Sequence, residues 1–146
     1  MLITFVCVGN TCRSPLLKHL FERQALSCGF QCQVKSAGLS VSDGKISPMT
    51  KKILLEHLID VEDENTTVLD DSLAIESDLI VAVSKDIADF ISSKGYESKV
   101  YALSHPLLIG EDMPDPYGAG QEAYEDIYRQ ALTAIPKIMA LARMLK

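Results

Sequence analysis

The sequence predicts an α/β fold: a three-layer sandwich in which a parallel sheet lies between two layers of helices. Short apolar runs alternate with longer segments whose apolar residues recur every three or four positions, the patterns of buried strands and of helices. Strands separated by helices need right-handed crossovers, which produce a parallel sheet covered on both faces. No repeat, low-complexity segment or long linker divides the chain, so we expect residues 1–146 to form one domain.

The N-terminal quarter contains the first strand, the first helix and a weaker second strand. Residues 2–6 are apolar except for Thr4, a pattern typical of a fully buried strand. Pro15 lies where the first turn of a helix tolerates proline, because its missing N–H would be unpaired there anyway. Residues 32–34 indicate a second strand. The first helix is expected to bury the side chains that recur at helical intervals: Leu16, Leu17, Leu20, Phe21 and Ala25.

The middle of the chain predicts two helices around a clear strand. Ser47 and Pro48 match an N-cap followed by a first-turn proline. Residues 79–83 are an uninterrupted apolar run and the clearest later strand. Ser84 is suited to cap the helix that follows, and Gly95 is suited to end it.

The C-terminal part completes the sheet and ends in a long helix. Residues 100–103 indicate the fourth strand, and an amphipathic helical pattern begins at Gln121. Pro136 interrupts this pattern, which predicts a kink or a restart. Ligands bind beyond the carboxyl ends of strands in such sheets, so the residues after the first, third and fourth strands are the first place to look for chemistry.

Composition excludes several classes of function. The chain is 47% hydrophobic and 23% charged, as in soluble globular proteins. No apolar run approaches the ~20 residues of a membrane span, and no signal peptide is recognisable, so we expect a cytoplasmic protein without a membrane partner. The net charge is −6 and the 14 Lys and Arg are scattered, which argues against nucleic acid as a partner. The four cysteines are expected to be thiols.

A short loop after the first strand combines four requirements for binding phosphate. Gly9 permits a tight loop whose N–H groups point at an anion, and the next helix directs its positive end to the same place. Arg13 offers a planar fork for two phosphate oxygens. Cys7, at the base of the loop, would lie under the phosphorus atom, where the same donors would stabilise its thiolate. The alternative is a structural cysteine beside a tight turn, but the strand, the glycine and the helix start are all in register with Cys7 and Arg13.

Two polar residues of the loop are expected to support this cysteine. Ser14 is placed to donate a hydrogen bond to Cys7 and later to help the sulfur leave. Asn10 is suited to brace the loop, because asparagine tolerates a positive φ.

A phosphate ester also needs a proton for its leaving group, and Asp115 is the candidate donor. It follows the fourth strand, and Pro114 and Pro116 on either side restrict its backbone. The alternative is an ordinary turn aspartate, since Asp-Pro is common in turns. Asp112 is the nearest competitor for this role and Glu111 a weaker one.

These motifs resemble the low-molecular-weight protein tyrosine phosphatase family over nearly the whole chain. The loop matches the family's Cys-x5-Arg-Ser signature, and residues 36–38 (Ser-Ala-Gly) and 115–118 (Asp-Pro-Tyr-Gly) match two further motifs. The resemblance implies a four-stranded parallel sheet in the order 2-1-3-4. It also implies a protein phosphatase that forms a phosphocysteine on Cys7, with Arg13 binding the phosphate and Asp115 as general acid and then base. Substrate or phosphate would be bound by Val8, Gly9, Asn10, Thr11, Cys12, Ser14 and Tyr117.

The partners implied are phosphorylated proteins, and the oligomeric state is left open, with a monomer favoured. No metal or organic cofactor is expected, because Arg13 and the loop amides supply the positive charge. By the same resemblance Tyr117 forms one wall of the pocket, with an ordinary half-buried tyrosine as the alternative. Cys12 either closes a reversible disulfide with Cys7 or is a small buried side chain.

Three local features concern the pocket walls, the support of the loop and the substrate. Tyrosine-directed relatives usually carry an aromatic residue soon after the Ser-Ala-Gly motif, but residues 39–42 are Leu-Ser-Val-Ser. Many relatives have a His and an Arg ahead of the third strand, and residues 64–68 contain neither. Thr11 occupies a position where tyrosine-type members often place Ile or Leu and the bacterial protein-arginine phosphatases place Thr. A hydroxyl suits a phosphoguanidinium better than a phenyl ring, so phosphoarginine is expected to be at least as good a substrate as phosphotyrosine.

Three rival functions are weighed against this one. Arsenate reductase on the same scaffold needs two later cysteines, and none follows Cys32. A zinc module built from the four cysteines has poor spacings for a tetrahedral site. A phosphoprotein-binding domain without catalysis would have lost the nucleophile or the acid, and both are present.

Overall fold

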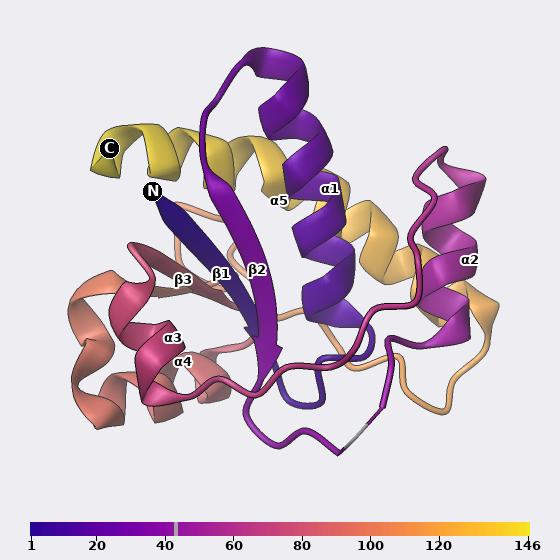
Figure 1. The fold of residues 1–146 in the computed structure, drawn as a ribbon, viewed down its shortest axis with the longest axis horizontal. Coiled ribbons are helices and arrows are strands. Elements are labelled where there is room, and N and C mark those ends of the chain that lie inside the picture. Colours follow the sequence, from indigo (N-terminus) through magenta and orange to yellow (C-terminus); the bar gives the residue numbers. More distant parts are fainter. Residues whose placement is uncertain (43) are drawn as a thin grey trace.

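A four-stranded parallel sheet in the order β2-β1-β3-β4 forms the centre of the computed structural model, which describes residues 1–42 and 44–146 (Figure 1). The predicted fold class and strand order are therefore confirmed. β1 is buried along its whole length because strands pair with it on both sides and helices cover both faces. The strands are β1 (Leu2–Cys7), β2 (Gln33–Gly38), β3 (Leu79–Ala82) and β4 (Val100–Ala102).

Helices cover the sheet on both sides. α1, α2 and α5 lie on one side, where α1 packs against β1, β2 and α5, and α3 and α4 lie on the other (Figure 1). One hydrophobic core includes side chains from the sheet and from all five of these helices. The helices are α1 (Arg13–Cys28), α2 (Pro48–Glu56), α3 (Asp71–Glu76), α4 (Lys85–Ile91) and α5 (Gln121–Leu145).

Two elements differ from the sequence prediction. β2 extends to Gly38, because its backbone pairs with β1 as far as the register Cys7↔Gly38. The Ser-Ala-Gly motif is therefore the end of this strand and does not follow it. α3 was not predicted, since six residues are too few to establish a helical period. Its start is nevertheless visible in the sequence: Asp70 is an N-cap whose side chain accepts a hydrogen bond from the N–H of Leu73.

The predicted helix ends are confirmed in three places, and of the two alternatives predicted for Pro136, a kink or a restart, the restart does not occur. Ser47 and Ser84 cap α2 and α4 by accepting hydrogen bonds from the N–H groups three residues later. Gly95, with φ of 98°, ends the short turn Ser92–Tyr96 that follows α4. α5 does not restart at Pro136 and continues as one helix. Pro136 and Leu132, whose carbonyl loses its helical donor, both lie on the exposed side of α5, where water can satisfy that carbonyl.

The carboxyl ends of the strands meet at one edge of the sheet. The loop after β1, residues 39–42 after β2 and the segment around Met113 all lie there, and the N–H of Met113 donates to the carbonyl of Val83 just beyond β3 (2.9 Å). This edge carries the residues that the sequence singled out.

Candidate active site

The loop between β1 and α1 turns its carbonyl groups away from its own interior. In a trans peptide the C=O and the following N–H point in opposite directions. Carbonyls held outward therefore leave the next amides facing inward, which is the arrangement of an anion-binding nest. Neighbouring segments hold three of these carbonyls: Leu39 N–H donates to Cys7 O (3.1 Å), Ser40 N–H to Val8 O (3.0 Å) and Ser47 N–H to Thr11 O (2.8 Å).

Cys7 lies at the base of this loop, with its sulfur among hydrogen-bonding groups. The residue is 2% exposed, the Ser14 hydroxyl lies 3.0 Å from Sγ, and the N–H of Asn10 donates to Sγ at 3.2 Å. Asn10 is the left-handed residue of the loop, with φ of 58°. Gly9 does not have a positive φ, and it contributes instead by leaving space in the cavity that it lines.

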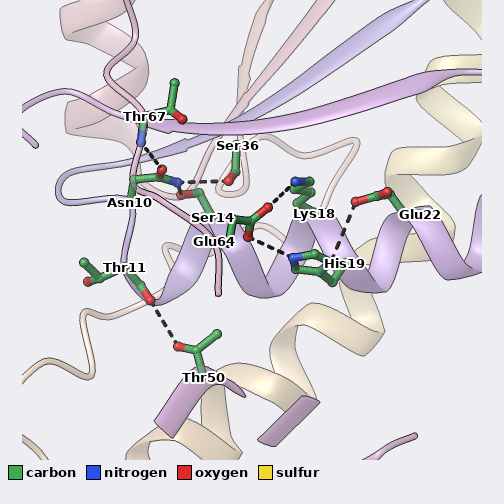
Figure 2. Close-up of polar contacts among 10 residues, drawn as sticks. All are labelled: Asn10, Thr11, Ser14, Lys18, His19, Glu22, Ser36, Thr50, Glu64 and Thr67. Atoms are coloured by element: carbon green, nitrogen blue, oxygen red, sulfur yellow. Dashed lines mark hydrogen bonds and ion pairs between the residues drawn. The ribbon is translucent and has the colours of Figure 1, made fainter. Parts of the chain in front are cut away.

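The side chain of Asn10 ties the loop to two other segments, as Figure 2 shows. Its amide nitrogen donates to the hydroxyls of Ser14 (2.8 Å) and Ser36 (3.0 Å), and its carbonyl oxygen accepts from the N–H of Thr67 (2.8 Å). Since Asn10 donates to Ser14, the single hydroxyl proton of Ser14 is available to the sulfur of Cys7 or to the carbonyl of Ala37, 3.3 Å away.

A cavity of about 250 Å³ opens above the cysteine. Arg13 lies almost buried in its wall, with Nη1 donating to the carbonyl of Met113 (3.0 Å) and Nη2 lying 3.9 Å from Oδ2 of Asp115. The Asp115 side chain is 55% exposed, and its Oδ1 accepts from the N–H of Tyr117 (3.0 Å). The lining residues are Cys7, Val8, Gly9, Thr11, Cys12, Arg13, Ser40, Ser42, Asp115 and Tyr117.

The two competing carboxylates do not line the cavity and accept hydrogen bonds from other parts of the protein. Asp112 Oδ1 accepts from the N–H of Lys85 in the first turn of α4 (2.9 Å), and Glu111 Oε1 accepts from the side chain of Gln130 (3.0 Å). Of the three carboxyl groups weighed from the sequence, Asp115 is the one that lines the cavity.

Most of the residues expected at the site are brought together, with two exceptions. Asn10 and Ser14 do not line the cavity and lie behind it, against the sulfur of Cys7. Tyr117 lines the cavity but is 79% exposed, so it stands at the rim. Ser40 and Ser42 contribute to the lining from the segment that lacks an aromatic residue, and the sequence analysis did not single them out as site residues.

Cys12 contacts a tyrosine from the far end of the chain. Its Sγ lies 3.2 Å from the hydroxyl of Tyr124 on α5 and 3.5 Å from the hydroxyl of Thr11. Burial, and then the hydrogen bond with Cys12, raise the pKa of Tyr124. All four cysteines are free thiols in the structure. Tyr124 lies 112 residues from Cys12, and no local sequence signal connects the two.

One family model matches residues 2–145, that of the low molecular weight phosphotyrosine protein phosphatases. The chain belongs to this family. The protein-arginine-phosphatase of Bacillus subtilis is 33% identical over 149 residues, which cover 99% of this chain and 96% of the relative. The low molecular weight protein-tyrosine-phosphatase PtpB of Staphylococcus haemolyticus is 30% identical, over 94% of this chain and 97% of the relative. The chain is thus a phosphatase.

Solved structures agree with this assignment. The C7S mutant of the YwlE arginine phosphatase, with a phosphorylated active-site serine, superposes with a TM-score of 0.91 at 29% identity and covers all of both chains. A YwlE mutant from Bacillus subtilis gives a TM-score of 0.90 at 28% identity, over 98% of this chain and 99% of that one.

In this low molecular weight phosphatase the segment ahead of β3 is anchored by an acidic residue. Glu64 Oε2 lies 3.0 Å from Nε2 of His19, and its Oε1 accepts from the ammonium group of Lys18 (Figure 2). The hydrogen bond with His19, helped by the one with Lys18, lowers the pKa of Glu64 to about 2 although partial burial opposes the shift. This cluster joins α1 to the segment that supports Asn10, at the place where the His and Arg of many relatives are missing.

Two further findings complete the description of the phosphatase. No helix in the described part of the chain is both long enough and apolar enough to cross a bilayer. Within residues 1–42 and 44–146, no three side chains of His, Cys, Asp or Glu gather as a metal site requires.

Proposed function

We propose that residues 1–146 act as one protein phosphatase domain that removes phosphate from protein side chains through a phosphocysteine on Cys7. The observation that carries the proposal is the position of the Cys7 sulfur, under a loop whose amides face inward and within hydrogen-bond distance of the Asn10 N–H and the Ser14 hydroxyl. These donors stabilise a thiolate. The solved relative with a phosphorylated serine at its active site supports a covalent intermediate of this kind.

The chemistry follows in two steps. In the first, the Cys7 thiolate attacks phosphorus, an S–P bond forms, the bond to the leaving group breaks, and Asp115 donates its proton to that group. Arg13 and the loop amides stabilise the charge on the phosphoryl oxygens. In the second, water gives its proton to Asp115 and attacks phosphorus, and the sulfur leaves as a thiolate with a hydrogen bond from Ser14. The products are the dephosphorylated side chain and inorganic phosphate.

Phosphoarginine is a substrate at least as good as phosphotyrosine. Thr11 places a hydroxyl at the cavity, and Ser40 and Ser42 line it in the segment where tyrosine-directed relatives carry an aromatic residue. Hydroxyl groups suit the N–H groups of a phosphoguanidinium, whereas a flat ring needs apolar walls. The relative named protein-arginine-phosphatase adds support.

Turnover of phosphoarginine and phosphotyrosine peptides by the wild type and by Thr11→Ile tests the substrate. We expect the substitution to shift the preference towards phosphotyrosine. A wild type that leaves phosphoarginine untouched contradicts the substrate assignment while leaving the phosphatase mechanism intact.

Cys7→Ser tests the mechanism. The variant should lose hydrolysis of an aryl phosphate and still bind inorganic phosphate, because the loop amides and Arg13 remain. Cys28→Ser is the matched control, since Cys28 is exposed and far from the cavity lining. Turnover that survives in Cys7→Ser would refute the phosphocysteine, and binding of phosphoprotein by an inactive wild type would favour the non-catalytic binding domain.

A monomeric state and a cytoplasmic location stay predictions.

A further inference from the structure

The carbonyl of Thr11 receives hydrogen bonds from two donors on α2 and its cap. The N–H of Ser47 lies 2.8 Å away, and the hydroxyl of Thr50 donates at 3.2 Å (Figure 2). Thr50 is 1% exposed, in the first turn of α2. Its N–H and its hydroxyl have different tasks: the N–H donates to the side chain of Ser47 and caps α2, while the hydroxyl reaches out of the helix to the phosphate loop.

The hydroxyls of Ser47 and Thr50 each have one proton to donate, and the hydrogen bonds around Thr50 can be made with these two protons. The Ser47 and Thr50 hydroxyl oxygens are 3.0 Å apart. When Thr50 gives its proton to the Thr11 carbonyl, Ser47 can give its own proton to Thr50. In this arrangement the buried hydroxyl of Thr50 has both an acceptor and a donor, which favours its pointing at the Thr11 carbonyl.

Holding the Thr11 carbonyl also sets the direction of the next amide. The carbonyl points at α2, so the N–H of Cys12, in the same trans peptide, points away from α2, and Cys12 is one of the residues that line the cavity. Cys12 is the N-cap of α1, and its side chain makes no capping hydrogen bond that would orient this turn from within α1. Its amide is one of the groups at the positive end of α1 that a bound phosphate would meet.

We propose that Thr50 is a positioning residue for phosphate binding: its hydroxyl fixes the Thr11–Cys12 peptide, and through it aims the Cys12 N–H at the phosphoryl group. The proposal rests on the phosphatase function proposed above. It also makes α2 a part of the active-site framework, since α2 packs against both α1 and α5.

Thr50→Val and Thr50→Ser form the matched pair of variants. Valine keeps the shape and removes the hydroxyl, whereas serine keeps the hydroxyl and removes a methyl group. A hydrogen bond to a charged group is worth about 1.5–3 kcal/mol, and a misaligned amide loses part of it. We expect Thr50→Val to raise the inhibition constant of inorganic phosphate about three- to tenfold and to lower kcat/KM for an aryl phosphate at least as much, with Thr50→Ser close to the wild type.

A second measurement uses the wild type alone. In a titration with inorganic phosphate followed by NMR, the amide of Cys12 should shift strongly as phosphate binds. If Thr50→Val does not fold, Thr50→Ala is titrated in the same way, and a Cys12 amide that responds there as strongly as in the wild type overturns the inference.

The outcomes separate the possible explanations. A folded Thr50→Val with an unchanged inhibition constant and unchanged kcat/KM would overturn the inference, even if its melting temperature is lower, because that is the result of a purely structural role. Equal losses in the serine and valine variants, or a Cys12 amide that ignores phosphate, overturn it too. A wild type that neither hydrolyses an aryl phosphate nor binds phosphate overturns the proposed function along with it.

Discussion

Gly38 ends β2 directly beside Cys7 in the sheet register, and a side chain there would collide with the phosphate loop. A Cβ atom at this position would lie 2.5 Å from the carbonyl oxygen of Val8, 2.8 Å from Cγ2 of Val41 and 3.0 Å from the backbone nitrogen of Asn10. The side chain of Val41 can rotate away. The two backbone atoms belong to the loop and can move only if the loop moves.

The size of this movement sets the expected cost of Gly38→Ala. To reach the 3.4 Å at which ordinary contact begins, the Val8 carbonyl must retreat by about 0.9 Å. Overpacking of this kind costs about 1–3 kcal/mol, which in a protein of this size lowers the melting temperature by about 3–9 °C. A shift of about 1 Å in reacting groups costs about 100-fold in rate. We expect kcat/KM for an aryl phosphate to fall about 100-fold.

Steady-state kinetics and thermal unfolding measure the two effects separately. Gly120→Ala is the matched control: a Cβ there meets nothing within 4 Å, and the backbone φ of −79° accepts alanine. Because Gly120 is the N-cap of α5, the variant should lose at most about 1 kcal/mol in free energy of unfolding, and its turnover should match that of the wild type. A Gly38→Ala protein that is folded and as active as the wild type would refute the argument that β2 and the loop are packed too closely for any side chain.

Three charged residues give further predictions. Asp115→Asn removes the proposed proton donor and should lower kcat for an aryl phosphate about 10²–10⁴-fold in steady-state assays. Arg13→Lys keeps the charge but loses the planar fork, so the inhibition constant of inorganic phosphate should rise about tenfold or more. Glu64 has its pKa lowered from 4.5 to about 2, so its bonds to His19 and Lys18 stabilise the fold above about pH 4.5, and this stabilisation is lost as the pH falls through 2. The shift corresponds to about 3.4 kcal/mol, which partial exposure to solvent reduces to about 1–2 kcal/mol. Glu64→Gln should lose this amount at pH 7 and show a flatter pH dependence between pH 5 and 2 in urea unfolding.

Each of these substitutions has a control elsewhere in the chain. Asp112→Asn tests a carboxylate that caps α4 and should keep its kcat, so equal losses at Asp112 and Asp115 would argue against a specific proton donor. Arg129→Lys alters an exposed ion pair on α5 and should leave phosphate inhibition unchanged. Glu62→Gln changes an exposed carboxylate two residues from Glu64, and a matching loss of stability there would mean that general charge, not the His19 and Lys18 contacts, is responsible.

The fold could be predicted because its signals are local. β1 is apolar except for Thr4, β3 is an uninterrupted apolar run, and α5 has a long apolar period, so their type follows from a few neighbouring residues. α3 is too short for such a period, and the length of β2 depends on pairing with β1, which sequence spacing does not reveal. The same limit explains Pro136, since helix continuity there depends on an exposed position that is known only once α5 is packed.

In the candidate site, too, the residues in local motifs could be predicted, whereas groups that contact the loop from distant parts of the sequence could not. Cys7, Arg13 and Asp115 were found because each lies in a short motif with a chemical reason for its residue types. The groups that hold the loop in shape were missed: the Thr50 hydroxyl and the N–H groups of Ser40 and Thr67 act on carbonyl or amide oxygens of residues far away in the sequence. Hydrogen bonds between residues so far apart in the sequence leave no local pattern from which they could be predicted.

The loop that carries Cys7 is made early in synthesis, but its supports come from almost the entire length of the chain. Arg13 bonds to the carbonyl of Met113, and Cys12 to Tyr124, 100 and 112 residues later. On the ribosome, Cys7 therefore emerges long before Met113 and Tyr124, and a nascent chain that stops short of α5 lacks the contact between Cys12 and Tyr124. The full set of contacts around the loop can therefore form only after the last helix is made and packs against α1.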